Sequence, residues 1–117
     1  MPYTKKSYLE HTAVYVKDIH WHLRFFEQAL GMPLRNLQGD KDDPIQAWTV
    51  GGVQLVVDKN FQGPEGRMAH LGIRTENLQE ALEEVYKFEG VKQMPGRERN
   101  WFTLPDGLAI ELMQIEK

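Results

Sequence analysis

The stretch Arg67-Met68-Ala69-His70-Leu71-Gly72-Ile73-Arg74 decides the fold, because its pattern occurs twice in the chain. The first copy is Leu9-Glu10-His11-Thr12-Ala13-Val14-Tyr15-Val16. In both copies a histidine opens a short alternating run, an Asp or Asn (Asp18, Asn77) follows seven residues later, and an amphipathic helical pattern begins there. An internal repeat of this kind predicts two modules of the same architecture.

The repeat extends to a later strand in each half. Gly51-Gly52-Val53-Gln54-Leu55-Val56 in the first half corresponds to Gly107-Leu108-Ala109-Ile110-Glu111-Leu112 in the second. His11 and Gln54 are 43 residues apart, and His70 and Glu111 are 41 residues apart. Each half therefore places one histidine and one further polar side chain at matching positions, opposite an apolar strand face.

The hydrophobic pattern predicts the order β-α-β-β-β in the first half. The helix begins after Asp18 as N-cap and ends at Gly31, since these residue types favour the two ends of a helix. Its apolar stripe consists of four residues: Ile19, Leu23, Phe26 and Leu30. Other predicted segments are strands over 8–16, 45–50 and 53–58 and a turn-rich loop over 36–44.

The second half repeats this order. Asn77 is the predicted cap of a helix with Glu80 at its third position, and the helix ends near Gly90. The last strands occupy 96–103 and 108–114, around a turn at Pro105-Asp106-Gly107. The result is an α+β fold of two β-α-β-β-β modules, which form curved mixed sheets with helices on the outer face.

Length and composition indicate one globular domain over residues 1–117, with module 1 at about 7–58 and module 2 at about 67–115. The chain has no cysteine, which excludes disulfides and thiolate ligands. A net charge of −3 without a basic stripe argues against nucleic acid, and no apolar run is long enough to cross a membrane. The N-terminus does not resemble a signal peptide, so we expect a cytoplasmic protein.

These motifs together resemble the vicinal oxygen chelate superfamily, which includes glyoxalase I, methylmalonyl-CoA epimerase, bleomycin and fosfomycin resistance proteins and extradiol dioxygenases. The resemblance covers nearly the whole chain. It rests on the strands opened by His11 and His70, the Phe25-Phe26 helix that leads into Ala29-Leu30-Gly31-Met32, and the closing Leu104-Pro105-Asp106-Gly107.

The polar residues opposite the apolar strand faces are candidate metal ligands: His11, Gln54, His70 and Glu111. Two imidazoles, a carboxylate and an amide oxygen suit a divalent ion such as zinc, nickel, cobalt, iron or manganese. The alternative is that these residues only hydrogen-bond to one another in a metal-free binding protein.

The resemblance implies several activities. The set His-Gln-His-Glu is similar to that of methylmalonyl-CoA epimerase and some glyoxalases, which implies a lyase or isomerase in which Glu111 carries a proton on a small oxygen-bearing substrate. His11, His70 and Glu111 alone also fit the iron site of an extradiol dioxygenase. A metal-free protein that binds a drug is the third possibility.

Four further residues are candidates for substrate binding: Tyr15, Arg74, Arg99 and Trp101. The two arginines could bind a carboxylate or phosphate. Tyr15 stands where glutathione-dependent glyoxalases commonly carry an arginine, which argues against glutathione as cosubstrate. Since each chain offers two open concave faces, and pairing is common in the superfamily, we expect a homodimer.

Overall fold

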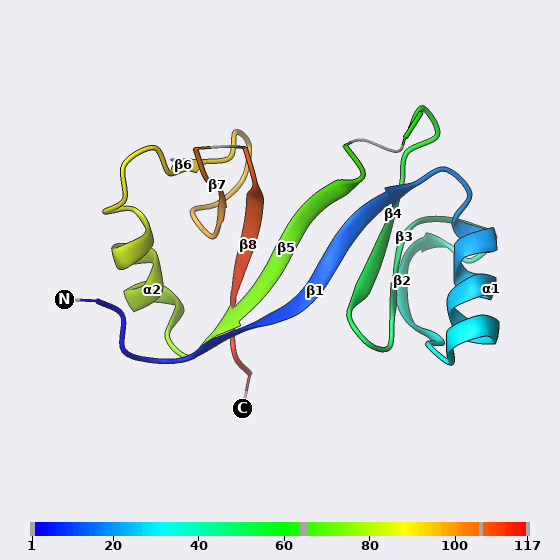
Figure 1. Cartoon of the computed structure of the whole chain (residues 1–117), viewed down its shortest axis with the longest axis horizontal. Helices are drawn as coiled ribbons and strands as arrows, with labels where there is room; N and C mark the ends of the chain where they lie inside the picture. The colour runs from blue at the N-terminus through cyan, green and yellow to red at the C-terminus, as the bar shows by residue number, and fades with distance from the viewer. Residues whose placement is uncertain (1, 64–65, 106, 117) are drawn as a thin grey trace. The chain divides into compact units, whose positions relative to one another are not determined.

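The computed structural model describes residues 2–63, 66–105 and 107–116, which form two compact units (Figure 1). Unit 1 comprises Met1–Glu10 with His70–Lys117, and unit 2 comprises His11–Ala69. The elements are β1 (Ser7–Val16), α1 (Ile19–Leu30), β2 (Leu34–Asp40), β3 (Asp43–Thr49), β4 (Val53–Val57), β5 (Met68–Thr75), α2 (Leu78–Val85), β6 (Lys92–Gln93), β7 (Trp101–Thr103) and β8 (Ala109–Gln114). The order β-α-β-β-β thus occurs twice, as the repeat predicts.

The strands follow the same order in both halves, β2-β3-β4-β1 in the first and β6-β7-β8-β5 in the second. In each half the first and last strands pair in parallel, β1 with β4 and β5 with β8, and the remaining pairs are antiparallel. Each unit has a hydrophobic core of its own, which includes Leu55 in unit 2 and Phe102 in unit 1. The predicted α+β fold of two β-α-β-β-β modules with curved mixed sheet and one helix each is confirmed.

Helix α1 has the predicted ends. The Asp18 carboxylate accepts a hydrogen bond from the Trp21 amide at 3.2 Å, and Gly31 adopts the left-handed conformation (φ 70°) that glycine favours. Of the predicted apolar stripe Ile19 is buried, whereas Leu30 is 57% exposed. Leu30 is the last residue of the helix and is absent from the packed cluster of unit 2.

The predicted loop over 36–44 is wrong, because most of this segment is strand. β2 and β3 form an antiparallel hairpin that turns between Asp40 and Asp43. β2 lies at the edge of its sheet, and all its residues except Leu37 are exposed. An edge strand with so few buried side chains lacks the alternation by which strands are recognised in a sequence. Gly39 (φ 101°) stands at a register shift, which further breaks the pattern.

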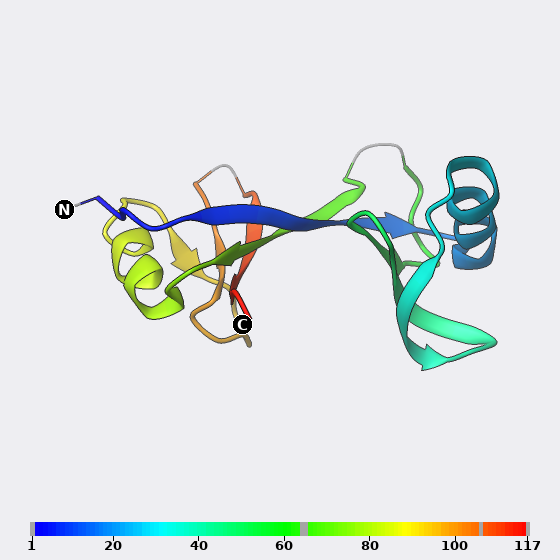
Figure 2. The same ribbon diagram turned by 90° about the horizontal axis from the view of Figure 1, so that it is seen from below.

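Helix α2 begins at the predicted cap, where the Asn77 side chain accepts from the Glu80 amide at 3.1 Å. The Glu80 carboxylate does not return to Asn77 but contacts Lys5 at 2.8 Å. The backbone amide of Asn77 donates instead to the Tyr3 hydroxyl at 3.0 Å. The N-terminal segment therefore completes the cap of α2, and Figures 1 and 2 both show it beside that helix.

Three further boundaries differ from the predicted ones. Helix α2 ends at Val85, five residues before Gly90. The strand predicted over 96–103 is only β7, since the preceding residues form turns closed by Arg97 N–H to Met94 O at 3.2 Å. The short strand β6 was not predicted. The predicted Pro105-Asp106-Gly107 turn includes Asp106, which lies outside the described residues.

Among the described residues, no helix is long and apolar enough to span a membrane.

The contacts of Tyr3 generate a test of the fold. Its hydroxyl lies 2.6 Å from Thr75 Oγ1, which is fully buried, and accepts from the Asn77 amide. Tyr3→Phe should lower the free energy of unfolding by about 1–2 kcal/mol, because it removes both bonds at a half-buried place. Urea denaturation measures the change. The control is Tyr8→Phe, which alters a half-exposed side chain. Equal effects of the two substitutions would contradict a stabilising role of the Tyr3 hydroxyl at the start of α2.

Candidate metal centre

The strand register gives each unit one histidine and one partner on the same sheet face. In unit 2, Ala13 of β1 is paired with Gln54 of β4, and His11 lies two residues before Ala13. Because side chains alternate along a strand, His11 and Gln54 project from the same face. In unit 1, Gly72 of β5 is paired with Glu111 of β8, and His70 lies two residues before Gly72. The sequence repeat thus corresponds to the same strand register in both units.

A tryptophan occupies the same place on the next strand in both units. Trp48 of β3 is paired with Gln54, and Trp101 of β7 is paired with Glu111. Each unit therefore presents a histidine, a Gln or Glu and a tryptophan on one face. The opposite face belongs to the core, as the buried Leu55 next to Gln54 illustrates.

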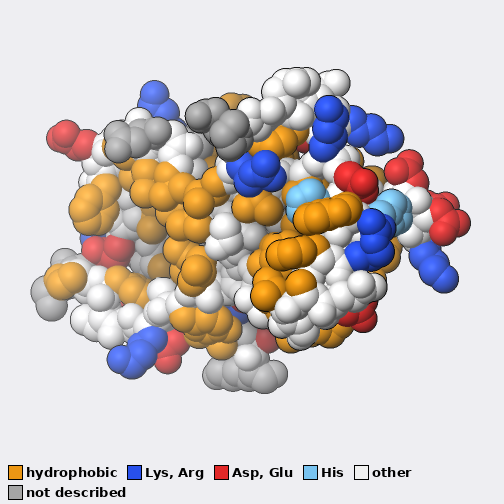
Figure 3. Space-filling model, turned by 45° about the vertical axis from the view of Figure 1, so that its right-hand side comes forward, with side chains coloured by type: hydrophobic (Ala, Val, Ile, Leu, Met, Phe, Trp, Pro, Cys, Tyr) orange, Lys and Arg blue, Asp and Glu red, His pale blue; other side chains and the backbone are white. Residues whose placement is uncertain are grey.

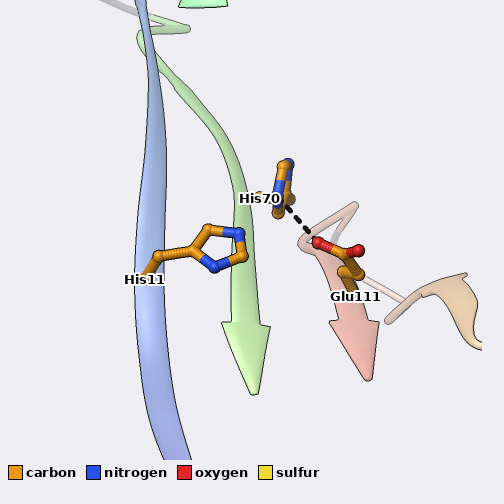
Figure 4. Close-up of side chains that lie close together, drawn as sticks. All are labelled: His11, His70 and Glu111. Carbon is orange, nitrogen blue, oxygen red and sulfur yellow. Dashed lines mark ion pairs between the residues drawn. The ribbon is translucent and has the colours of Figure 1, made fainter. Parts of the chain in front are cut away.

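Unit 1 supplies the charged half of the candidate site (Figure 4). His70 Nε2 lies 3.5 Å from Glu111 Oε1, and the His70 ring packs edge-on against Trp101 with centroids 4.7 Å apart. His70 is only 8% exposed, whereas the Glu111 side chain is 22% exposed. The imidazole is thus held between an indole and a carboxylate, and the carboxylate keeps partial access to solvent.

Unit 2 contains the other two candidate ligands, with an amide in place of the carboxylate. His11 and Gln54 are each 5% exposed. The Gln54 side chain donates from Nε2 to Gln46 Oε1 at 2.7 Å, while its own Oε1 is buried and accepts no hydrogen bond from the described residues. A buried acceptor is rarely left without a partner, so this oxygen is a candidate acceptor for a bound water, ion or ligand.

Three of the candidate ligands have side chains whose donor atoms form a close group. Possible ligand atoms of His11, His70 and Glu111 all lie within 4.8 Å of one another (Figure 4). His11 directly follows Glu10 in β1, and the Glu10 carboxylate contacts Arg74 of unit 1 at 3.4 Å. Two imidazoles and a carboxylate form a donor set that suits iron, manganese, zinc, cobalt or nickel, so the residues present fit a divalent ion.

The predicted substrate-binding residues have different environments. Trp101 packs on His70, as described. Arg74 is engaged with the protein, through Glu10 and through a bond from Nη1 to Gln114 O at 2.8 Å. Tyr15 is half-buried in β1, where its backbone amide donates to Arg67 O at 2.7 Å.

Arg99 is not brought to Trp101. Its guanidinium lies over the Tyr86 ring, 4.7 Å from the centroid, and the Tyr86 hydroxyl donates to Arg99 O at 2.6 Å. Burial raises the pKa of Tyr86, so this hydroxyl stays protonated as a donor at neutral pH. Arg97 instead lies over Trp101 at 4.6 Å. The sequence reasoning missed Arg97 because it continued the strand alternation into residues that form turns.

The two histidines of α1 are not part of the candidate site. His20 Nε2 lies 3.1 Å from Asp42 O, and His22 Nδ1 lies 2.6 Å from Asp18 O.

The same helix carries an exposed aromatic pair, Trp21 stacked on Phe25 with centroids 5.4 Å apart. Figure 3 shows hydrophobic side chains reaching the surface on this side of the molecule.

The chain matches no protein-family model and no curated protein sequence. Solved structures do match it. Methylmalonyl-CoA epimerase from Mycobacterium tuberculosis is 18% identical, with a TM-score of 0.61 over 93% of this chain and 88% of that chain. A 2,3-dioxygenase from Pseudomonas sp. KL28 is 20% identical, with a TM-score of 0.65 over 93% of this chain but 42% of that one.

The Mn(II)-bound glyoxalase from Novosphingobium aromaticivorans is 19% identical, with a TM-score of 0.60 over 91% of this chain and 38% of that chain. The epimerase is matched over most of its length, whereas the dioxygenase and the glyoxalase are matched over less than half of theirs. All three align with both halves of the repeat, since more than nine tenths of this chain is covered. The chain therefore has the fold of the vicinal oxygen chelate superfamily.

Proposed function

We propose that this chain is a divalent-metal-dependent lyase or isomerase that moves a proton on a small oxygen-bearing substrate. The observation that carries the proposal is the repeated register, which sets His11 with Gln54 and His70 with Glu111 on one face of each unit. In the proposal these four residues hold one metal ion. The buried acceptor on Gln54 supports the inclusion of that residue.

A bound divalent ion would supply Lewis acidity, which lowers the pKa of a C–H bond next to a chelated carbonyl. Glu111 accepts that proton at a carboxylate oxygen and returns it, and its partial exposure leaves it accessible to a substrate. Gln54 has no basic group, so it orients but does not carry the proton. Only one of the two halves therefore contains the base.

The surroundings of His70 favour a flat or anionic substrate. Trp101 lies against the imidazole, and the Arg97 guanidinium lies over Trp101. A cation is therefore close to the proposed site. The described ion pairs do not include Arg97. A guanidinium binds carboxylate or phosphate oxygens in pairs. We propose Arg97 as a further substrate-binding residue, in addition to the candidates Tyr15, Arg74, Arg99 and Trp101.

A second candidate is a non-haem iron dioxygenase of the extradiol type. It is favoured by the group of His11, His70 and Glu111, because two histidines and one carboxylate are the ligand set of such iron sites. Gln54 as fourth ligand argues for the isomerase, since it leaves fewer positions for both dioxygen and a chelated diol. A metal-free drug-binding protein is the third alternative, and it predicts no dependence on metal.

Three further expectations belong to the proposal. The two units act as a single domain over 1–117, the protein forms a homodimer, and it works in the cytoplasm on a small molecule without nucleic acid or membrane. The reason for the homodimer is the pairing that is common among proteins with this fold, and light scattering at micromolar concentration tests it directly.

Metal binding is the first test of this function. His70→Ala should lower the affinity for Mn(II) or Zn(II) by orders of magnitude, because it removes one of about four ligands. The fold should persist, since the imidazole packs on Trp101 and not in the helix-packed core. Elemental analysis and metal titration measure the loss. The matched control is His20→Ala, which alters an exposed histidine of α1. Equal metal content in the two variants would exclude His70 as a ligand.

Proton transfer is the second test. The metal-loaded protein should exchange the α-hydrogen of 2-hydroxycarbonyl or 2-methyl-3-oxo compounds with heavy water, at equal rates with and without oxygen. Glu111→Gln should abolish the exchange, because an amide cannot accept the proton. Nuclear magnetic resonance follows the α-hydrogen signal. Oxygen uptake with catechols, together with no exchange on any carbonyl compound, would assign the chain to the dioxygenases.

A further inference from the structure

Three glutamines form a row of hydrogen bonds across unit 2. Gln54 of β4 donates from Nε2 to Gln46 Oε1 of β3 at 2.7 Å, and Gln46 Nε2 donates in turn to Gln38 Oε1 of β2. Gln46 and Gln38 are directly paired in the β2–β3 register. The row runs from a buried side chain through a half-buried one to an exposed one. Nothing in the proposed chemistry requires Gln46 or Gln38 to touch a substrate.

The row has a direction, and the direction decides what Gln54 presents at its buried end. Each amide passes its N–H donor outward to the next oxygen, so the remaining acceptor of the row is Gln54 Oε1. That oxygen is buried and accepts no hydrogen bond from the described part of the chain. With the opposite direction Gln54 would present its NH₂ group, which is a hydrogen-bond donor and does not bind a cation because its nitrogen lone pair is delocalised into the carbonyl.

We propose that Gln46 is a positioning residue, which fixes the Gln54 amide so that its oxygen, and not its nitrogen, serves as a ligand for the divalent ion. This inference rests on the proposed function. Its physical basis is that partners around a metal site orient the ligands, and their removal typically lowers metal affinity by about 10–100-fold. The exposed Gln38 ends the row and can turn in solvent, so Gln46 carries most of the orienting effect.

Substitutions at Gln46 separate orientation from packing. Ionised Glu at this position only accepts, Met offers no donor and only a weak sulfur acceptor, and Lys only donates. Gln46→Glu should keep the Mn(II) affinity within about threefold of the parent, Gln46→Met should weaken it about tenfold, and Gln46→Lys should weaken it more, because a donor turns the Gln54 oxygen outward. Electron paramagnetic resonance of free Mn(II) gives the affinities, and thermal melting in a chelator checks that the folds are intact.

Substitutions at Gln38 serve as controls for the charge that the Gln46 variants introduce. Gln38→Glu and Gln38→Lys place the same charges one strand further out, and neither should reproduce the difference between the Gln46 variants. Binding of Mn(II) that is lost in His70→Ala but equal in Gln46→Met and the parent would overturn the positioning role and leave the proposed metal site intact. Absence of Mn(II) binding in the parent protein would overturn the proposed function itself, so the two failures are distinct.

Discussion

The parallel pairing of the first and last strands of each half is the constraint on which the rest of the structure depends. It fixes Ala13 opposite Gln54 and Gly72 opposite Glu111, and alternation then assigns every neighbouring side chain to one of two faces. A shift by one residue would exchange the core face and the polar face in either half. The apolar residues that face each helix therefore hold the candidate ligands in place.

The two halves share this register but differ in charge. Unit 1 has a carboxylate with partial access to solvent beside a buried imidazole, whereas unit 2 has a buried amide in the equivalent position. The carboxylate can both bind a cation and move a proton, but the amide can only bind. In the proposed function Glu111 and Gln54 divide these two tasks between equivalent positions. Each is accompanied by a contact that restricts a candidate ligand: the Gln46 hydrogen bond to Gln54 in unit 2 and the Trp101 packing on His70 in unit 1.

The parts of the fold that depend on strong local signals could be predicted from the sequence. Asp18 and Asn77 are caps because their side chains accept from backbone amides of the first turn, and Gly31 ends α1 because it tolerates a positive φ. β2 was missed because an edge strand buries little. The cap completed by Tyr3 was missed because it joins residues 74 positions apart, which no local pattern reveals.

The candidate site shows the same division. His11, Gln54, His70 and Glu111 could be selected because strand alternation and the repeat both point to them. Arg97 could not, because its place over Trp101 depends on the turn before β7 and not on periodicity. Gln46 was overlooked for a similar reason, since Gln54 lies diagonally across from it on the neighbouring strand and only the folded structure shows the hydrogen bond between the two amides.

In the proposed function the two halves contribute one pair of ligands each to a single divalent ion. The most direct measurement is a crystal structure of the protein grown with Co(II) or Mn(II), with diffraction recorded on both sides of the metal absorption edge. We expect one anomalous peak per site, within coordination distance of His11, His70, Glu111 and the Gln54 oxygen. A peak that lies elsewhere, or no peak at saturating metal, would contradict it.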